Sequence, residues 1–338
     1  MDWIVTTLEH DRTLGIADIA QAKRRIHGYT LETPLVSSSL LNQWLGHEVY
    51  FKAECLQKVG AFKARGGCNT VRWLLENGRR PERIIANSSG NHAQAVAWAS
   101  SLFDIPSTIF MPENVSRVKA RATESYGAEV VLCATRAEVD ERVLEAAKDP
   151  GVYWIPPYNH EQVICGQGTA AYEALHELGE VDAVFAPCGG GGLVSGTLIA
   201  TRALAPKAEM IAAEPLQAND AAISLRENRI HCLSATPDTL ADGARTLAVG
   251  DITFEYIRRL DALYEVEEQR IAFWTQWLTH LLKLHIEPTS AMTMDAVRQW
   301  LKGRSGKKRL LVILTGGNVD QGMMSALWRD NYLNEFEL

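Results

Sequence analysis

The chain has 338 residues, of which 46% are hydrophobic and 22% are charged, which is typical of a globular protein with a sizeable core. The formal net charge of −7 argues against a nucleic-acid partner, because phosphate binding requires a basic face. The first ten residues lack an export signal and no apolar segment has the length of a membrane span, so we expect a cytoplasmic protein with six reduced cysteines.

Short apolar segments alternate with helical patterns along the chain. The first helix is predicted over residues 16–29. Strands are predicted over residues 49–53, 83–86, 108–111, 129–132, 183–186, 209–213 and 309–314. This alternation predicts an α/β fold with mostly parallel sheets. Ligands of such sheets bind outside the carboxyl ends of the strands, so the loops that follow the strands are candidates for the functional site.

A lysine lies in the segment that follows the first of these strands. Lys63 is preceded by the apolar residues Ala61 and Phe62. A lysine amine becomes a nucleophile towards an aldehyde when its surroundings lower its pKa. Taken alone, however, this segment is better explained by a surface lysine at the start of a helix.

Three further strand-end loops are rich in glycine and small polar residues. Residues 87–92 read NSSGNH before an apolar helix, and this cluster could hold a carboxylate with backbone N–H groups and the helix dipole. Residues 189–192 are four glycines between a strand and a helix, which favours a bound phosphate over a flexible linker. The third loop, residues 315–318, reads TGGN. The spacing fits neither a Walker loop nor a dinucleotide-binding fingerprint.

The four segments together resemble the signatures of the fold-type-II pyridoxal 5′-phosphate (PLP) enzymes, the tryptophan-synthase-β-like superfamily. Within it they resemble the serine/threonine dehydratase and serine racemase branch. The matching motifs are GAFKARGG at 60–67, SSGNHAQ at 88–94, GGGGL at 189–193 and LTGGN at 314–318. The resemblance extends over about residues 16–325. The sulfhydrylase branch fits less well, because it typically has Asp-Arg directly after the lysine.

The resemblance implies an α/β fold of two lobes, each a mostly parallel sheet flanked by helices, with PLP in the cleft between them. It implies a large PLP-binding domain of residues 1–83 and 156–338 and a small mobile domain of residues 84–155. It also implies a homodimer that acts on a small-molecule amino-acid substrate, without a nucleic-acid or membrane partner. Because little sequence follows Thr315, we expect no C-terminal regulatory domain.

The resemblance also implies which residues hold the cofactor. Lys63 would bind PLP covalently and then shuttle the Cα proton of the substrate. Asn91 would bind the PLP 3′-oxygen, the glycine run would bind the phosphate, and Thr315 would face the pyridine nitrogen. The whole cofactor set is Phe62, Lys63, Asn91, Gly189, Gly190, Gly191, Gly192, Leu193 and Thr315.

A substrate site and a metal site are implied in the same way. In the racemases, the position of Ser89 is the catalytic base on the ring face opposite the lysine. The substrate-binding set is Ser88, Ser89, Asn91, His92, Tyr158, Gly243 and Thr246. Glu214 and Asp220, with the carbonyl group of Ala218, would bind Mg²⁺, Mn²⁺ or Ca²⁺ through hard oxygen ligands.

The activity implied is α,β-elimination of a β-hydroxy amino acid such as threonine or serine, which gives a 2-keto acid and ammonia. Ala61 replaces the usual serine of the lysine motif, and PPYN at 156–159 replaces a His-Pro-Asn pattern of the racemases. No arginine aligns cleanly with the substrate-adjacent arginine that racemases have near the region of Asp140.

Two alternatives to this activity stay open. One is a racemase of the serine or aspartate type. The other is a catabolic dehydratase of a 3-hydroxyaspartate-, phenylserine- or hydroxyectoine-derived substrate. A 3-hydroxyaspartate enzyme should have a cation near the side-chain pocket, for which Arg136, Arg142 and Arg245 are candidates.

Overall fold

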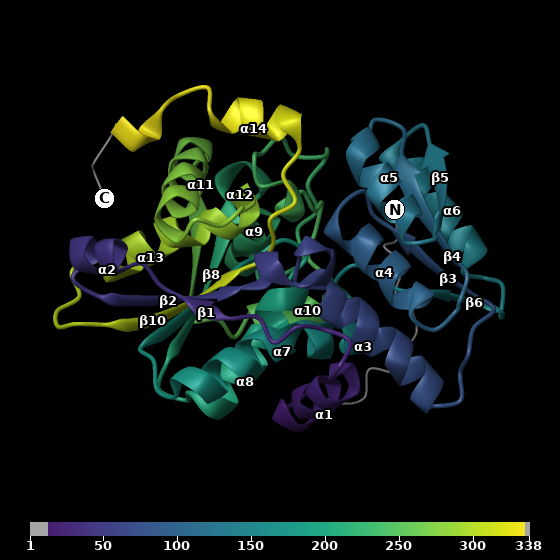
Figure 1. Cartoon of the computed structure of the whole chain (residues 1–338), viewed down its shortest axis with the longest axis horizontal. Coiled ribbons are helices and arrows are strands. Elements are labelled where there is room, and N and C mark those ends of the chain that lie inside the picture. Colours follow the sequence, from purple (N-terminus) through teal and green to yellow (C-terminus); the bar gives the residue numbers. More distant parts are fainter. Residues whose placement is uncertain (1–12, 335–338) are drawn as a thin grey trace.

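The computed structural model describes residues 13–334 and shows two lobes side by side (Figure 1). Residues 1–12, where no export signal is expected, and residues 335–338 lie outside this range. Over residues 13–334, none of the helices combines the length and apolar character that crossing a membrane requires.

The large lobe contains a six-stranded sheet with the order β1-β2-β10-β7-β8-β9. Its strands are β1 (Leu35–Val36), β2 (Glu48–Ala53), β7 (Ala183–Pro187), β8 (Glu209–Pro215), β9 (Ala262–Val266) and β10 (Arg309–Leu314). Only the pairing of β1 with β2 is antiparallel. The run Leu310–Leu314 is buried throughout, as expected for a parallel strand covered on both faces.

Helices cover both faces of this sheet (Figure 1). On one side lie α1 (Ile16–Ile26), α7 (Glu161–Leu178), α8 (Gly192–Leu204), α9 (Asp220–Glu227) and α10 (Asp251–Ile257). On the other lie α2 (Ser39–Leu45), α11 (Glu268–Leu282), α12 (Pro288–Ala291), α13 (Thr293–Leu301) and α14 (Gln321–Leu327). Trp274 and Trp277 are buried in this second core.

The small lobe contains a parallel four-stranded sheet with the order β5-β4-β3-β6. The strands are β3 (Arg83–Asn87), β4 (Ser107–Pro112), β5 (Glu129–Cys133) and β6 (Val152–Trp154). Its helices are α4 (Asn91–Ser101), α5 (Arg117–Ser125) and α6 (Arg136–Ala146). α3 (Lys63–Glu76) packs against α4 so closely that a Cβ atom at Gly67 would lie 3.0 Å from the Ala95 carbonyl oxygen.

The described residues also form short 3₁₀ helices. They are η1 (Glu54–Leu56), η2 (Lys58–Gly60), η3 (Leu216–Ala218), η4 (Asp242–Ala244) and η5 (Tyr332–Asn334). The prediction of a two-lobed α/β fold with mostly parallel sheets is confirmed, and the seven predicted strands are present with small differences at their ends. Sequence reasoning missed β1, β6 and β9, which are short or only half buried and therefore lack a clear apolar run. The first helix ends at Ile26, three residues before its predicted end.

Candidate active site

Lys63 is held at the cleft by contacts with the loop that follows β10. The backbone N–H of Phe62 donates to the Thr315 carbonyl oxygen at 2.9 Å, and Ala61 forms an isolated β-bridge with Gly316. Lys63 is the first residue of α3, and its Nζ lies 5.1 Å from the centre of the Phe62 ring. Two loops that are about 250 residues apart in the sequence therefore fix the lysine together.

Lys63 as a whole residue is half buried, and its Nζ donates to the carbonyl oxygen of Pro157 at 2.5 Å. Burial lowers the pKa of Lys63 to about 8, although the negative charge of Glu287 opposes this shift. An amine with such a pKa is partly neutral near physiological pH, as a nucleophile or a proton acceptor must be.

The loop after β3 brings Ser88, Ser89 and Asn91 to the same cleft at the N-terminus of α4. His92 is buried, and its Nε2 donates to the Ile155 carbonyl oxygen at 2.8 Å. Burial, together with the positive charge of Lys63, lowers the pKa of His92 to about 3, so the ring is neutral. Its Nδ1 then carries no hydrogen, which leaves the backbone N–H of His92 as the group that could donate to a carboxylate.

Asn91 and Thr315 meet at a carboxyl group that the sequence did not suggest. Asn91 Nδ2 donates to the two oxygens of Glu287 at 3.0 and 3.2 Å, and Thr315 Oγ1 donates to Glu287 Oε1 at 3.1 Å. Asn318 Nδ2 donates to Asn91 Oδ1 at 2.8 Å and so defines the orientation of the Asn91 amide. Burial and the charge of Asp242 raise the pKa of Glu287 to about 7.

The four glycines after β7 form a cradle without side chains. Gly191 has a φ of +93°, which favours glycine, and α8 begins at Gly192. A Cβ atom at Gly190 would lie 2.2 Å from the Tyr158 ring, whose hydroxyl donates to the Ala248 carbonyl oxygen at 3.0 Å. Leu193, which follows the run, is buried in the large-lobe core. The first N–H groups of a helix have no intrahelical partner, so they are free to bind an anion.

Gln167 supports a polar ligand at this cradle. A Cβ atom at Gly192 would lie 2.7 Å from Gln167 Oε1. Both polar atoms of the Gln167 side chain are buried without a hydrogen-bond partner among the described residues, which is costly unless a ligand or water completes them. The glycine cradle and this amide therefore fit the phosphate group of a cofactor held by Lys63.

Glu214, Ala218 and Asp220 are brought together between β8 and α9. Glu214 accepts hydrogen bonds from the backbone N–H groups of residues 221 and 222, both at 2.9 Å. Asp220 Oδ1 accepts from Thr246 Oγ1 at 3.4 Å, whereas Oδ2 is buried with no partner among residues 13–334. Burial raises the pKa of Asp220, and burial together with the Asp220 charge raises that of Glu214.

These oxygens fit a divalent cation, because a cation would stabilise both buried carboxylates. The described residues contain no group of three or more His, Cys, Asp or Glu side chains arranged for a metal. A cation here would therefore depend on the Ala218 carbonyl and on water for its remaining ligands.

The three arginines considered for a side-chain pocket all have protein partners, and only Arg136 acts on a predicted site residue, because its charge opposes the rise in the pKa of Tyr158 that burial causes. Arg136 and Arg142 are exposed on α6, where they pair with acidic residues one turn away at 3.4 and 2.8 Å. Arg245 donates Nη2 and Nε to the Thr239 carbonyl oxygen at 2.6 and 3.0 Å.

Lys119 provides a cation at the cleft instead. Its Nζ lies 2.5 Å from Asp242 Oδ2, so that an ion pair joins α5 of the small lobe to η4 of the large lobe. The charges of both residues act on the pKa of Glu287, which places the pair beside the site. Gly243 donates its N–H to Thr289 Oγ1 at 3.0 Å, and its carbonyl oxygen lies 3.2 Å from an ideal Cβ at Gly189.

A buried ionic network lies behind the lysine. Arg65 Nε lies 2.7 Å from Glu54 Oε2, and Arg65 Nη1 lies 2.8 Å from Glu173 Oε1. Lys52 also pairs with Glu173, at 2.8 Å. Although burial opposes it, the charges of Arg65 and Lys52 lower the pKa of Glu173 to about 2. The network fixes the first turn of α3 and hence Lys63.

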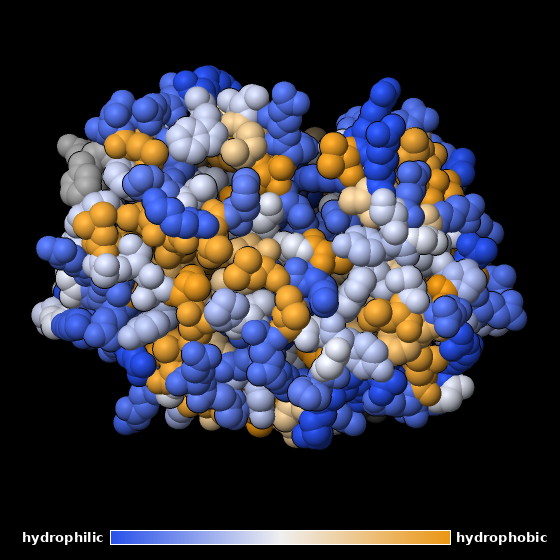
Figure 2. Space-filling model, in the orientation of Figure 1, coloured by the Kyte–Doolittle hydropathy of each residue, from blue (hydrophilic) through white to orange (hydrophobic). Residues whose placement is uncertain are grey.

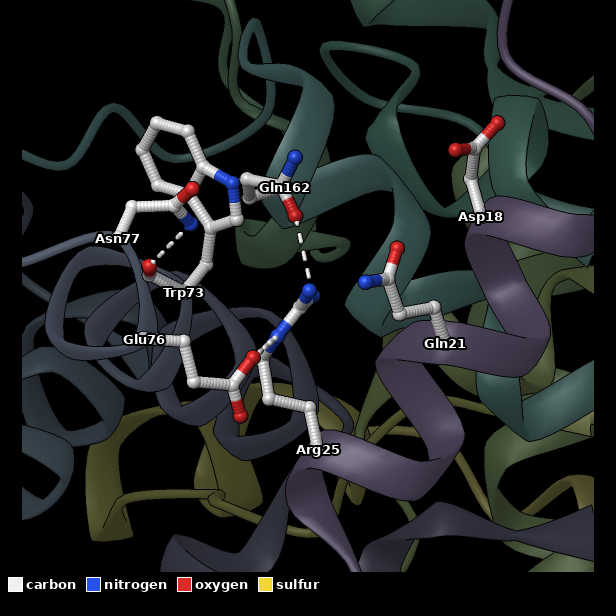
Figure 3. A pocket seen from close by; sticks show the side chains of 7 residues that line it. All are labelled: Asp18, Gln21, Arg25, Trp73, Glu76, Asn77 and Gln162. Carbon is white, nitrogen blue, oxygen red and sulfur yellow. Dashed lines mark hydrogen bonds and ion pairs between the residues drawn. The ribbon is translucent and has the colours of Figure 1, made fainter.

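A polar surface pocket of about 420 Å³ lies away from this site (Figure 3). It is formed by α1, α7 and the far end of α3, where Trp73 is ten residues, or roughly 15 Å, beyond Lys63 along the helix. Arg25 projects between Glu76 and Gln162, and its Nε donates to Glu76 Oε2 at 2.7 Å (Figure 3). The ion pair lines this pocket, and none of the residues described around Lys63 takes part in the lining.

Comparisons with known proteins agree with this geometry. The family model described as "Pyridoxal-phosphate dependent enzyme" matches residues 26–316. An L-threo-3-hydroxyaspartate ammonia-lyase of Saccharomyces cerevisiae is 40% identical over 312 residues, which cover 92% of this chain and 95% of the relative. A serine racemase of Schizosaccharomyces pombe is 38% identical over 305 residues, covering 90% and 94%. The solved structure of a T.th. threonine deaminase superposes with a TM-score of 0.84 at 39% identity, covering 91% of this chain and 99% of the other.

Proposed function

Because the chain belongs to the pyridoxal-phosphate-dependent enzyme family, we propose that it catalyses α,β-elimination of a β-hydroxy amino acid such as threonine or serine, releasing a 2-keto acid and ammonia. The observation that carries this proposal is the position of Lys63, whose amine has a lowered pKa. It lies beside the loops after β3 and β10 and contacts Pro157, next to the Tyr158 ring that packs on the glycines after β7. When bound through this lysine, the cofactor supplies an electron sink for negative charge at the substrate Cα.

The chain's own residues would then perform four tasks. Lys63 would take the Cα proton, for which a pKa near 8 is well suited. Ser88, Ser89 and the first N–H groups of α4 would bind the substrate carboxylate. Tyr158, packed on the glycine cradle, would limit the size of the substrate side chain. Closure of the small lobe would exclude water, and the ion pair between Lys119 and Asp242 would favour the closed form.

Several finer features belong to the same proposal. We assign a divalent cation to Glu214, Ala218 and Asp220, supported by the unpartnered Asp220 oxygen. We assign residues 84–155 to a mobile small domain, supported by the separate sheet β3–β6. We also propose a cytoplasmic location.

We propose a homodimer, supported by apolar residues gathered on the large-lobe side of the face in Figure 2, over α2 and the β1–β2 edge. Leu31, Leu40 and Leu56 are more than 40% exposed, and burying such apolar side chains in a contact between subunits would stabilise a dimer. Sedimentation of the purified protein would test this assembly, and a monomer at micromolar concentration would contradict it.

The elimination is tested by incubating the purified protein, loaded with PLP, with L- and D-serine, L-threonine, phenylserine and the 3-hydroxyaspartate isomers. Keto acid and ammonia are expected from at least one of them, and Lys63→Ala should abolish the release. Full turnover by Lys63→Ala would refute the role of the lysine. Interconversion of L- and D-serine without keto acid would indicate a racemase.

A second candidate, elimination from 3-hydroxyaspartate, is favoured by the cation at the cleft. The substrate β-carboxylate could accept a hydrogen bond from Lys119 Nζ, because an ammonium group has three donors and Asp242 uses one. Lys119→Gln should lower kcat/KM for L-threo-3-hydroxyaspartate by about tenfold or more, since a charge-assisted hydrogen bond contributes roughly 1.5–3 kcal/mol.

The control for this candidate is L-serine, whose side chain carries no charge. Lys119→Gln should reduce kcat/KM for L-serine much less than for the dicarboxylate. Lys148→Gln, which removes an exposed lysine just beyond α6, should change neither value. An equal loss for the two substrates would assign Lys119 to lobe closure alone.

A further inference from the structure

Glu287 is held rigidly against the loop that carries Thr315. Its backbone N–H donates to the Gly316 carbonyl oxygen at 3.0 Å. A Cβ atom at Gly316 would lie 2.6 Å from Glu287 Oε1, so only glycine allows the carboxyl group this close approach. The carboxyl group is buried and lies 3.1 Å from Thr315 Oγ1.

The direction of the Thr315 hydroxyl follows from counting hydrogens. Ser290 Oγ accepts from the backbone N–H groups of Thr315 and Gly316 at 2.8 and 3.1 Å, which occupies both of its lone pairs. Ser290 has one hydroxyl hydrogen and two acceptors for it, Thr315 Oγ1 at 2.7 Å and the Gly316 carbonyl oxygen at 3.2 Å. The shorter contact makes Ser290 the donor to Thr315. The single hydrogen of Thr315 is left for Glu287 or for a third group beside the hydroxyl.

That third group is the pyridine nitrogen of PLP, if Thr315 faces it as the resemblance implies. When Glu287 is ionised, it attracts the Thr315 hydrogen, and the ring nitrogen faces a lone pair that favours an N–H on the ring. When Glu287 carries a proton, it can donate to Thr315 Oγ1, and Thr315 can then donate to an unprotonated ring nitrogen. The hydroxyl thus connects two sites that can each hold the same proton.

We propose that Glu287 and the pyridine nitrogen of bound PLP share one proton through the hydroxyl of Thr315. In one direction the Glu287 O–H bond breaks as a new bond forms to Thr315 Oγ1, and the original Thr315 O–H hydrogen moves to the ring nitrogen. The products are a carboxylate and a protonated ring, and the reverse transfer restores both neutral groups. Glu287 is a positioning residue that acts on the cofactor through Thr315. The inference rests on the proposed function and on the cofactor contact that the resemblance implies for Thr315.

The charges around Glu287 are consistent with a movable proton. The titratable groups that interact electrostatically with Glu287 are Lys63 of α3, Lys119 of α5, Asp242 of η4 and Cys55 of η1. Burial and Asp242 raise the pKa of Glu287 to about 7, whereas the hydrogen bonds from Asn91 and Thr315 and the charge of Lys119 lower it. A carboxyl group in this range can exchange a proton with a pyridine at little cost.

The test is the ¹⁵N chemical shift of the ring nitrogen in holoenzyme reconstituted with ¹⁵N-labelled PLP, from about pH 6 to about pH 9. In the wild type the single shared proton is lost to solvent as pH rises, which leaves both Glu287 and the ring nitrogen without it, so the shift should move towards the unprotonated value. In Glu287→Gln the amide can donate to Thr315 but has no proton to transfer, so the shift should stay at the unprotonated, hydrogen-bonded value throughout. Identical curves for the two proteins would overturn the proposal.

Two further variants make the result decisive. Asp242→Asn removes a charge that raises the pKa of Glu287, so it should keep the titration but move its midpoint to lower pH. Thr315→Val removes the link and leaves Glu287 in place, so it should abolish the movement even if Glu287→Gln fails to bind PLP. A wild-type curve in Thr315→Val would show that Thr315 does not face the nitrogen and would refute the relay.

The measurement needs no substrate, so it separates this inference from the proposed function. A protein that releases no keto acid still gives the ¹⁵N titration. Conversely, turnover with a ring shift that is independent of Glu287 would leave the elimination intact and remove the relay.

Discussion

Glu173 and Glu287 are both largely buried carboxyl groups, yet their pKa values move in opposite directions. Glu173 contacts the cations Arg65 and Lys52, whereas Glu287 receives hydrogen bonds from the neutral donors Asn91 and Thr315. Burial favours the neutral acid in both cases, and only a cation in direct contact reverses this preference. The paired carboxylate holds the scaffold in place, and the carboxyl group without a contacting cation keeps a proton that chemistry can use.

The largest change in stability is expected from removing the cation that pairs with Glu173. Arg65→Met would leave Glu54 and Glu173 buried without their main cation, which should lower the free energy of unfolding by about 3–5 kcal/mol. Urea-induced unfolding of the apoprotein measures the difference.

The control for this prediction is Arg142→Met, which removes an exposed pair with Glu138 and should change stability by less than about 1 kcal/mol. If Arg65→Met were as stable as this control, the network would contribute no stability to the start of α3.

For Glu287, the carboxyl group without a contacting cation, the comparison is tested by how the free energy of unfolding depends on pH. The native apoprotein binds a proton at Glu287 more tightly than the unfolded chain does, so this group stabilises the fold less as pH rises from about 4.5 to about 7. Glu287→Gln removes that loss. Unfolding at pH 8 should show the variant more stable than the wild type by up to about 3 kcal/mol, with little difference at pH 4.

Glu173→Gln is the matched variant with the opposite sign. The folded-state pKa of Glu173 is lowered to about 2, so its contribution is present above about pH 4.5 and is lost as pH falls towards 2. The variant should therefore be less stable than the wild type at pH 7 and approach it under acid. Parallel pH profiles for Glu173→Gln and Glu287→Gln would contradict the comparison.

The smallest expected effect concerns the cofactor cradle rather than either carboxyl group. Gly190→Ala places a methyl group against the Tyr158 ring. The side chains and backbone must shift to accommodate such an extra group, which costs about 1–3 kcal/mol of free energy. We expect the Kd for PLP to rise by roughly tenfold to a hundredfold, because 1.4 kcal/mol corresponds to a factor of ten. Fluorescence titration of the apoprotein measures this value.

Gly15→Ala, where a Cβ atom meets nothing within 4 Å, is the control for the added methyl group. A Gly190→Ala variant with unchanged affinity would place the phosphate away from the glycine run.

Much of the site followed from the sequence because it is built from strand-end loops. Lys63, Asn91, Gly190 and Thr315 each follow a strand, and parallel strands place such residues at one edge. Glu287 lies before the short helix α12 and reaches the site only through its contact with Gly316, so no local pattern marks it.

The ion pairs of the cations around the site could not be predicted from the local sequence either. Lys119 looks like an ordinary polar residue of an amphipathic helix, and its role emerges only when the two lobes meet at Asp242. Arg65, two residues after the lysine, finds Glu54 and Glu173 only in the folded protein. Charged partners far apart in sequence depend on tertiary packing, which periodicity and turn signals do not encode.

The position of β10 has a consequence for biosynthesis. This strand leaves the ribosome last of the ten described strands, yet it pairs with β2 and β7 in the middle of the large sheet. Until it emerges, a nascent chain exposes two unpaired sheet edges, which are sites of misassembly. The same strand delivers Thr315 to the loop of Lys63. A truncated product should therefore be both prone to aggregation and unable to capture the vitamin-derived cofactor, so that only finished chains withdraw it from the cellular pool.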